Sequence, residues 1–382
     1  MRVTGYAYPW DVLDDPGFLD RVADLGVDEV AVAASYHAAR AATPWQHDRT
    51  AVIAAHAAIY RPVRESAWAG QVLRPSYAGW VAEPDAAGAA VRRLIEAGVP
   101  VAPWLVLTHN SLLGNSFPEF SGQNCFAERY PWALCPSRPE VRQYAATLAG
   151  ECVRELDAHT VILESCGPMG AVHQHIHEKT DAVWAPATAR LLSICCCPAC
   201  TEGWTMAGLD VGRTVALLAA EVRRLIGTGD LGLTADELPA EVSAGLLAAR
   251  QRAVDELRAG VLAALGSPER VVLHGSPDPW ATGALPGLTP TAAGDVRSVV
   301  VQCWQPGQAS LDAVRRTAAG STVDIGAYVT GVAAQPVGDI AGYVRDLAAA
   351  GATELHLYHL GLAGPARLDD LRAAVQAAHA CG

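Results

Sequence analysis

Eight short runs rich in β-branched residues, each followed by a stretch with helical spacing, constrain the fold of this 382-residue chain more than any other feature. The expected strands are Val3–Tyr8, Glu29–Ala34, Val101–Leu107, Thr160–Glu164, Arg270–His274, Ser298–Cys303, Val323–Val329 and Glu354–Tyr358. The expected helices include Phe18–Leu25, Ala86–Ala97, Pro139–Leu156, Val211–Ile226, Leu311–Ala318, Ile340–Ala350 and Leu368–His379. This repeated strand-then-helix order indicates a parallel sheet covered by helices.

Eight such units in one chain predict an α/β fold, namely a (β/α)8 TIM barrel with long insertions after strands 2, 3 and 4. An open doubly wound sheet is the competing layout, but no glycine-rich nucleotide-binding motif follows any strand. We expect residues 1–382 to form a single barrel domain, with a lid or small subdomain at residues 36–82. Residues 234–266 are expected to add a pair of helices.

The composition of the chain argues against several classes of binding partner. Hydrophobic residues make up 51% of the chain and charged residues 18%, and no apolar run approaches the ~20 residues of a membrane helix. The net charge of -12 argues against nucleic acid and anionic membranes, because no basic stripe is present. The first ten residues enter a strand without the features of a signal peptide. We therefore expect a cytoplasmic protein that binds a neutral small molecule.

The residues expected at the carboxyl ends of the strands, where such barrels carry their chemistry, are mostly aromatic or polar. They are Tyr8, Trp10, Tyr36, His37, Trp104, His109, Asn110, Glu164, His274, Asp278, Trp280, Gln302, Trp304, Tyr328, Tyr358 and His359. Indole rings suit stacking against the C–H faces of a sugar, although packing that closes the barrel mouth is the alternative. We expect this set to bind a small-molecule carbohydrate substrate.

Glu164 is the strongest single candidate, because it places a carboxylate at the end of the apolar run 161–163. A structural salt bridge is the alternative. The loop beyond it contains His173, His175 and His177 at a spacing of two, followed by Lys179, the sole lysine of the chain. In an extended segment such histidines point the same way and could bind a metal or substrate hydroxyls, whereas a solvated loop would leave them without a role. We assign His173, His175 and Lys179 to substrate binding.

A cysteine cluster follows at residues 195–200, with the sequence CCCPAC. It contains a Cys-x-x-Cys pair, which is a zinc signal, but a second pair at the usual spacing is missing. Three consecutive thiols do not easily face one tetrahedral centre. We therefore favour buried thiols beside the site over structural zinc or a thiol nucleophile, and we expect no metal ligand and no cofactor.

A family resemblance appears in residues 133–142, ALCPSRPEVR, which resemble the CPxxPxVR segment that opens the helix before strand four in many glycoside-hydrolase-like TIM barrels. Glu164 and the segment 192–200, LSICCCPAC, resemble the strand-four glutamate and the downstream CxCxxC element of the same group. With Tyr36 and His37, the resemblance extends to residue 210. It implies that Glu164 is the general acid/base of a glycosidase-like hydrolase.

The second carboxylate is where this chain departs from the pattern. Retaining glycosidases place it about 5 Å from the first, and inverting ones about 6.5 to 9.5 Å away. Strands six and seven end without an acid, Asp324 comes too early in its strand, and Glu354 opens strand eight. Asp278, after strand five, is the best remaining candidate for base or nucleophile.

We therefore expect a glycosidase-like enzyme acting on a small glycoside. Two alternatives stay open. One is a divalent-metal-dependent hydrolase or sugar isomerase that uses the histidines of the 173–177 loop together with His274. The other is a non-catalytic sugar-binding barrel, which the missing second acid favours.

Overall fold

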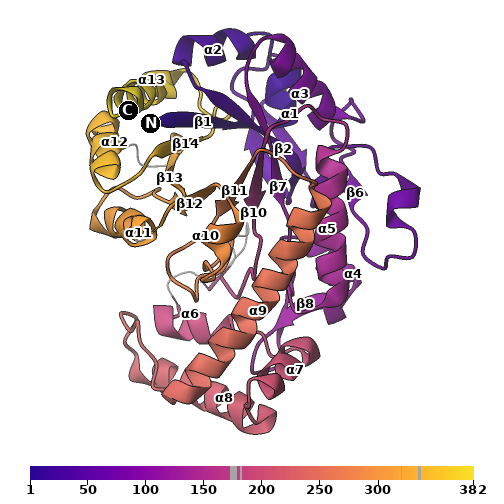
Figure 1. The fold of residues 1–382 in the computed structure, drawn as a ribbon, viewed down its shortest axis with the longest axis vertical. Coiled ribbons are helices and arrows are strands. Elements are labelled where there is room, and N and C mark those ends of the chain that lie inside the picture. Colours follow the sequence, from indigo (N-terminus) through magenta and orange to yellow (C-terminus); the bar gives the residue numbers. More distant parts are fainter. Residues whose placement is uncertain (173–178, 181–182, 320, 334–336) are drawn as a thin grey trace.

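A closed ring of eight parallel strands forms the centre of the computed structural model, which describes residues 1–172, 179–180, 183–319, 321–333 and 337–382 (Figure 1). The strands are β1 (Arg2–Ala7), β2 (Glu29–Tyr36), β7 (Val101–Val106), β10 (Thr160–Glu164), β11 (Arg270–His274), β12 (Ser298–Gln302), β13 (Asp324–Thr330) and β14 (Glu354–Tyr358). The ring closes because β1 pairs with both β2 and β14. The prediction of a (β/α)8 TIM barrel is confirmed.

Helices cover the outside of the ring. They are α1 (Pro9–Asp14), α2 (Phe18–Leu25), α3 (Ala86–Glu96), α5 (Pro139–Val153), α10 (Ala292–Asp295), α11 (Gln308–Ala318), α12 (Ile340–Ala349), η3 (Pro365–Arg367) and α13 (Leu368–Ala380). Their buried faces are apolar, as with Leu371, Ala374 and Val375 on α13. Gly26 ends α2 in the left-handed conformation, with φ 72°, which turns the chain directly into β2.

The insertion after β2 contains β3 (Ala39–Ala42), β4 (Ala51–Ala54), β5 (Ala58–Ile59), η1 (Glu65–Trp68) and β6 (Ser76–Tyr77). β3 and β4 form an antiparallel pair, whereas β5 pairs with β2. The indole of Trp45 donates to the Ala363 carbonyl, and Gln46 donates to the Trp10 carbonyl, both at 2.9 Å. The segment therefore packs over the loops that follow β1 and β14. That it acts as a lid stays a prediction.

Two further insertions follow β7 and β10. The first contains α4 (Ser111–Ser116), η2 (Pro118–Phe120), β8 (Ser121–Gln123) and β9 (Arg129–Leu134), and the second contains α6 (Pro186–Leu192), α7 (Pro198–Met206), α8 (Val211–Thr228) and α9 (Ala240–Ala264). The helices α6 to α9 extend away from β1 and share a second apolar core, which includes Leu191, Trp204, Leu218 and Leu246 (Figure 1). Within the described ranges, no helix combines the length and apolarity needed to cross a bilayer.

The expectation of two helices within residues 234–266 is wrong. A single 25-residue helix, α9, begins after Pro239 and runs beside α5 (Figure 1). No proline interrupts it, and the glycines at 245 and 260 are not followed by a turn. Isolated glycines weaken a helix but do not end it when tertiary packing supports it.

The interior of the barrel is filled by aromatic and polar side chains, where aliphatic residues are more usual. The ring of Tyr6 contacts those of Trp104, His274, Tyr328 and His356, with centroids 4.9 to 5.9 Å apart. These five residues belong to five different strands. The rings therefore meet near the barrel axis and tie the strands together across it.

We expect Leu105→Ala to lower the free energy of unfolding by about 2–5 kcal/mol, because Leu105 is fully buried and faces the helices while its neighbour Trp104 faces the interior. Denaturant unfolding measures the loss. Ile53→Ala is the control, since that side chain is 66% exposed and its truncation should cost under about 0.5 kcal/mol. Equal losses would contradict this packing arrangement.

Candidate active site

Glu164 ends β10 and points into the barrel. Its side chain is buried, and its Oε2 accepts a hydrogen bond of 2.9 Å from the indole Nε1 of Trp104 on β7. The Nδ1 atom of His274, at the end of β11, lies 3.6 Å from the same oxygen. Three neighbouring strands thus converge on one carboxyl group, at the end of the barrel where such folds carry out chemistry.

Burial governs the charge of this carboxyl group. Desolvation raises the pKa of Glu164 to about 8, and the hydrogen bond from Trp104 offsets only part of this effect. No arginine or lysine contacts Glu164 among the described residues. The group is therefore protonated at neutral pH, which is the form required of a general acid.

The turn immediately after Glu164 is held in a conformation that non-glycine residues rarely adopt. Ser165 has a φ of 53°. Its amide donates to the Ala284 carbonyl at 2.9 Å, and the hydroxyl of Thr108 donates to the carbonyls of Ser165 and Gly167. Such backbone conformations cost about 1–3 kcal/mol and cluster at functional sites. Here the bonds fix the direction in which the chain leaves the end of β10.

A wall of rings surrounds the barrel mouth. Tyr36 contacts Trp104 and Tyr8 at 4.8 and 5.1 Å, and the hydroxyls of Tyr8 and Tyr358 lie 3.2 Å apart. Trp304 stacks on Tyr358 at 5.6 Å. Since these residues come from strands far apart in the sequence, the ring of strands brings together most of the aromatic residues that we expected at the site.

The wall has a deep layer and an accessible layer. Tyr8, Tyr36, Trp104 and Tyr328 are buried, whereas His37, His109, Trp304 and Tyr358 are partly exposed. The ring of His37 stacks between those of Tyr36 and His109, at 4.2 and 4.4 Å. The partly exposed rings are the ones available to a ligand, and the deeper rings support them.

Three of the residues that we expected to bind substrate instead make contacts with other residues of the protein. Trp10 is buried and stacks on Tyr8. Asn110 caps α4 by accepting from the Leu113 amide at 3.0 Å, and its amide donates to the hydroxyl of Tyr144. His359 is fully buried, with Nδ1 3.8 Å from Oδ2 of Asp11. Gln302, by contrast, is exposed at the end of β12.

Asp278 and Trp280 lie on the loop after β11, beside the helical extension. Asp278 is exposed and accepts from the backbone amide of Trp280 at 3.0 Å. The guanidinium of Arg250 on α9 lies 5.9 Å from the Trp280 ring. Among the described residues, no hydrogen bond or ion pair joins Asp278 to Glu164, so its role as base stays a prediction. His173, His175 and His177 lie outside the described residues, and Lys179 is exposed.

Two residues that the sequence did not single out, Tyr6 and His356, lie deeper in the barrel. The hydroxyl of Tyr6 lies 2.8 Å from Nε2 of His274 and 3.0 Å from Nδ1 of His356, and Nε2 of His356 lies 3.3 Å from Glu354. Tyr6 and His356 each precede an expected site residue by two positions. Because side chains alternate along a strand, that spacing was a usable signal that they face the same interior.

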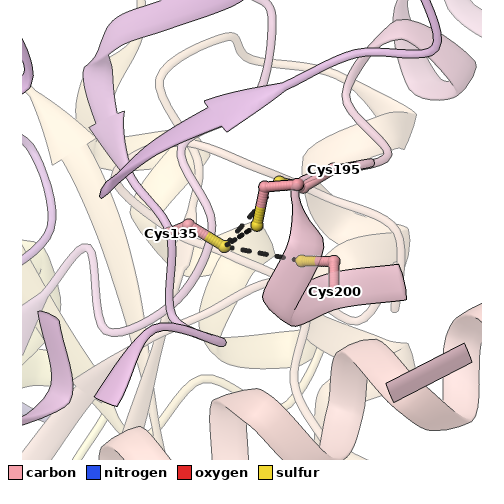
Figure 2. A group of neighbouring side chains, drawn as sticks. Cys135, Cys195 and Cys200 are labelled. Atoms are coloured by element: carbon pink, nitrogen blue, oxygen red, sulfur yellow. Dashed lines mark hydrogen bonds between the residues drawn. The ribbon is translucent and has the colours of Figure 1, made fainter. Parts of the chain in front are cut away.

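A second cluster of reactive groups lies where two insertions meet. Cys135 follows β9, and Cys195, Cys197 and Cys200 surround the start of α7. Their sulfur atoms all lie within 4.8 Å of one another. Figure 2 shows the side chains of Cys135, Cys195 and Cys200 pointing toward one another. Cys196 instead directs its thiol to the Ile194 carbonyl. The partner that the sequence did not show is therefore Cys135, sixty residues before Cys195.

The four thiols suit a tetrahedral metal ion. Zinc–sulfur bonds of about 2.3 Å place sulfurs about 3.8 Å apart, and Cys135 lies 3.4 to 3.7 Å from the other three. Hydrogen bonds from the neighbouring thiols, Cys135 first, lower the pKa of the thiol of Cys197, the residue that precedes the first turn of α7. The four cysteines could therefore hold Zn²⁺, which would join the insertion after β7 to the one after β10.

No protein-family model and no curated protein matches this sequence. Solved structures match its fold. α-L-Fucosidase isoenzyme 2 from Paenibacillus thiaminolyticus and the catalytic domain of β-amylase from Paenibacillus polymyxa both align with a TM-score of 0.57, at 13% and 11% identity. A β-galactosidase from Rahnella sp. R3 aligns at 0.54 and 11% identity. These similarities show that the chain shares the TIM-barrel fold with these enzymes.

The alignments differ in how much of each enzyme they include. They cover 98%, 100% and 98% of this chain, but 49% of the fucosidase, 98% of the β-amylase domain and 55% of the β-galactosidase. The chain thus spans about half of two of these structures. At identities this low, the similarity shows only a shared fold, and the function has to be inferred from the residues of the site.

Glu164→Gln should stabilise the protein at alkaline pH. As the pH rises from 4.5, the ordinary pKa of a glutamate, to about 8, the unfolded carboxyl ionises while the folded one stays protonated. Wild-type stability therefore falls across this window, by at most about 1.4 kcal/mol per pH unit, and glutamine removes the loss. Urea unfolding at pH 5 and pH 8 tests this. The exposed Glu96→Gln is the control, and a gain that does not depend on pH would contradict the assignment.

Metal analysis tests the cysteine cluster. We expect the purified protein to contain about one zinc per chain, and Cys135→Ser or Cys197→Ser to lose the metal and melt at lower temperature, since both remove a ligand of a closed tetrahedral site. Cys381→Ser is the matched control, because Cys381 is exposed and lies outside the cluster. Protein that refolds fully in a chelator and binds no zinc would show that the thiols are merely buried together.

Proposed function

We propose that the protein is a carbohydrate-active hydrolase of the glycosidase type, in which Glu164 is the general acid/base acting on a small glycoside. One observation carries this proposal. The carboxyl group of Glu164 is buried at the carboxyl ends of the strands, accepts a hydrogen bond from the Trp104 indole and lies among aromatic rings, and its burial raises its pKa to about 8. The glycoside-hydrolase-like fold supports it.

In the proposed reaction, Glu164 gives its proton to the glycosidic oxygen as the bond to the anomeric carbon breaks. The resulting carboxylate keeps the hydrogen bond from the Trp104 indole, which becomes stronger when its acceptor is charged. Asp278 supplies the base or nucleophile, so that water completes the hydrolysis. If Asp278 is the nucleophile, Glu164 takes a proton from the water that releases the sugar from Asp278. If Asp278 is the base, it takes that proton itself and Glu164 is reprotonated from solvent.

The accessible rings support the choice of a small substrate. Trp304 and Tyr358 offer flat apolar faces to a sugar ring, and the imidazoles of His37 and His109 offer hydrogen bonds to hydroxyl groups. Glu164 is only 5% exposed, so the reacting bond has to approach a carboxyl group that is almost fully buried. Lys179, His173 and His175 complete the proposed binding set.

A non-catalytic sugar-binding barrel is the second candidate. It is favoured by one observation, namely that the described residues place no second carboxylate against Glu164. The same arrangement of rings would bind a sugar without cleaving it. The two candidates differ in turnover and not in affinity.

Glycosides with different leaving groups separate these candidates. In the hydrolase, Glu164→Gln should reduce kcat by about 10²- to 10⁴-fold on an alkyl glycoside and far less on a dinitrophenyl glycoside, whose leaving group needs no proton. Sugar binding, measured by calorimetry, should persist. Wild-type kcat/KM should fall as the pH rises through about 8, because the acid is then ionised. Glu96→Gln should behave as wild type.

Two outcomes would overturn parts of this proposal. Tight sugar binding without turnover across a broad panel of glycosides favours the sugar-binding barrel. Full activity of Asp278→Asn removes Asp278 from the mechanism while leaving the role of Glu164 intact.

A further inference from the structure

A cavity of about 60 Å³ lies where the four clustered thiols meet helix α9 and the loop after β11. Its lining includes Cys135, Cys195 and Cys200, together with Arg250 of α9 and Trp280 of the loop. Most of the other lining side chains are apolar, and among the described residues Arg250 is the one basic group of this lining. The thiols and a guanidinium group therefore share one cavity.

The positive charge of Arg250 has no carboxylate partner among the described residues. Arg258, eight positions later in the same helix, shows the usual arrangement, because it pairs with Asp255 and Asp295, both at 2.7 Å. The guanidinium of Arg250 donates only to main-chain carbonyls in this part of the chain. A partly buried guanidinium without a paired carboxylate is costly unless another group supplies negative charge.

The four thiols supply that charge when they hold a metal ion. Zinc binds cysteine as the thiolate, and four thiolates around one Zn²⁺ leave an excess of negative charge. Burial lowers the pKa of Arg250 to about 10, whereas the acidic groups of Cys200, Asp278 and Cys195 act in the opposite direction. Arg250 is therefore still a cation at neutral pH, beside the thiols.

The same guanidinium holds the loop after β11. Its Nη2 atom donates to the carbonyls of Trp280 and Ala281, at 3.2 and 2.6 Å. These bonds have one possible direction, because a guanidinium only donates and a carbonyl only accepts. The amide of Ala281 in turn donates to the Asp278 carbonyl at 3.0 Å. Arg250 thus fixes the turn that carries Asp278.

The loop also supports the turn after Glu164. The amide of Ser165 donates to the Ala284 carbonyl at 2.9 Å, and the amide of Gly283 donates to the Pro168 carbonyl at 3.1 Å. Residues 278–284 therefore lie between Arg250 and the chain that leaves the end of β10. Main-chain hydrogen bonds join them to both.

We infer that Arg250 is a positioning residue, which balances the negative charge of the metal-loaded thiols and links them to the loop of residues 278–284. Metal binding then orders this loop, and with it Asp278 and the turn after Glu164. The catalytic consequence rests on the proposed function. The link between the metal and the loop is a property of the folded protein.

Zinc affinity tests the role of the charge. Competition with a chelator of known affinity should give Arg250→Met a zinc dissociation constant about 10- to 100-fold above that of the wild type, because the apolar stem remains but the charge is lost. Arg250→Lys keeps the charge and should recover most of this affinity. Arg252→Met, an exposed position on the same helix, is the matched control and should bind as wild type. Equal losses in Arg250→Met and Arg250→Lys, no loss in either, or a wild type that binds no zinc would overturn the inference.

Hydrogen exchange tests the link to the loop. Removing zinc from the wild type should speed amide exchange in peptides that contain residues 278–284 by about tenfold or more, the scale expected when a hydrogen bond from a charged donor weakens. Peptides from β1, on the opposite side of the ring, should not change. In zinc-saturated Arg250→Met the loop should exchange fast while α7 stays protected.

Loop exchange that does not respond to zinc in the wild type contradicts the link, and this measurement needs no variant to fold. Loop exchange in zinc-saturated Arg250→Met as slow as in the wild type contradicts the part played by Arg250. Neither readout needs turnover. A protein without glycosidase activity would therefore remove the proposed function and leave this inference standing.

Discussion

Burying a carboxyl group inside a closed barrel is the constraint on which the site depends. Such a group must either pair with a cation or take up a proton, because an isolated charge is too costly there. This barrel contains both solutions. Glu354 lies against Arg270, which favours its ionised form, whereas no arginine or lysine among the described residues contacts Glu164, whose pKa burial raises to about 8. Two identical side chains thus differ in charge because of their position along the barrel axis.

The interior rings connect the fold to this chemistry. Gly326 on β13 illustrates how closely they pack, since a Cβ atom there would lie 2.7 Å from the His356 ring. A glycine at this position gives the imidazole room to reach both Tyr6 and Glu354. The polar contacts across the axis are therefore part of the packing of the barrel. A change to the hydrogen bonds near Glu164 is accordingly also a change to the core.

The fold was more predictable than the site. The spacing of hydrophobic residues and the glycines that end helices are local signals, so all eight strands could be predicted from the sequence. Glu164 was recognised as a site residue because it lies at the end of one of these strands. The fourth thiol, Cys135, joins Cys195, Cys197 and Cys200 only after two insertions fold together, and no local spacing encodes that contact. Likewise, Trp10 is buried and Trp304 is partly exposed, although both follow strands. Their sequence positions alone did not distinguish them.

The exposure of Asp278 bears on why the described residues place no second acid beside Glu164. Two buried carboxyls in contact would compete for one proton, and a further ionised group without a cation would have to be desolvated. A solvated loop imposes no such desolvation cost, and Asp278 lies exposed on the loop after β11. Environments that separate the protonation states of an acid and a base are what acid–base catalysis requires. Glu164 and Asp278 differ in burial in this way, and in the proposed mechanism substrate binding would have to bridge the space between them.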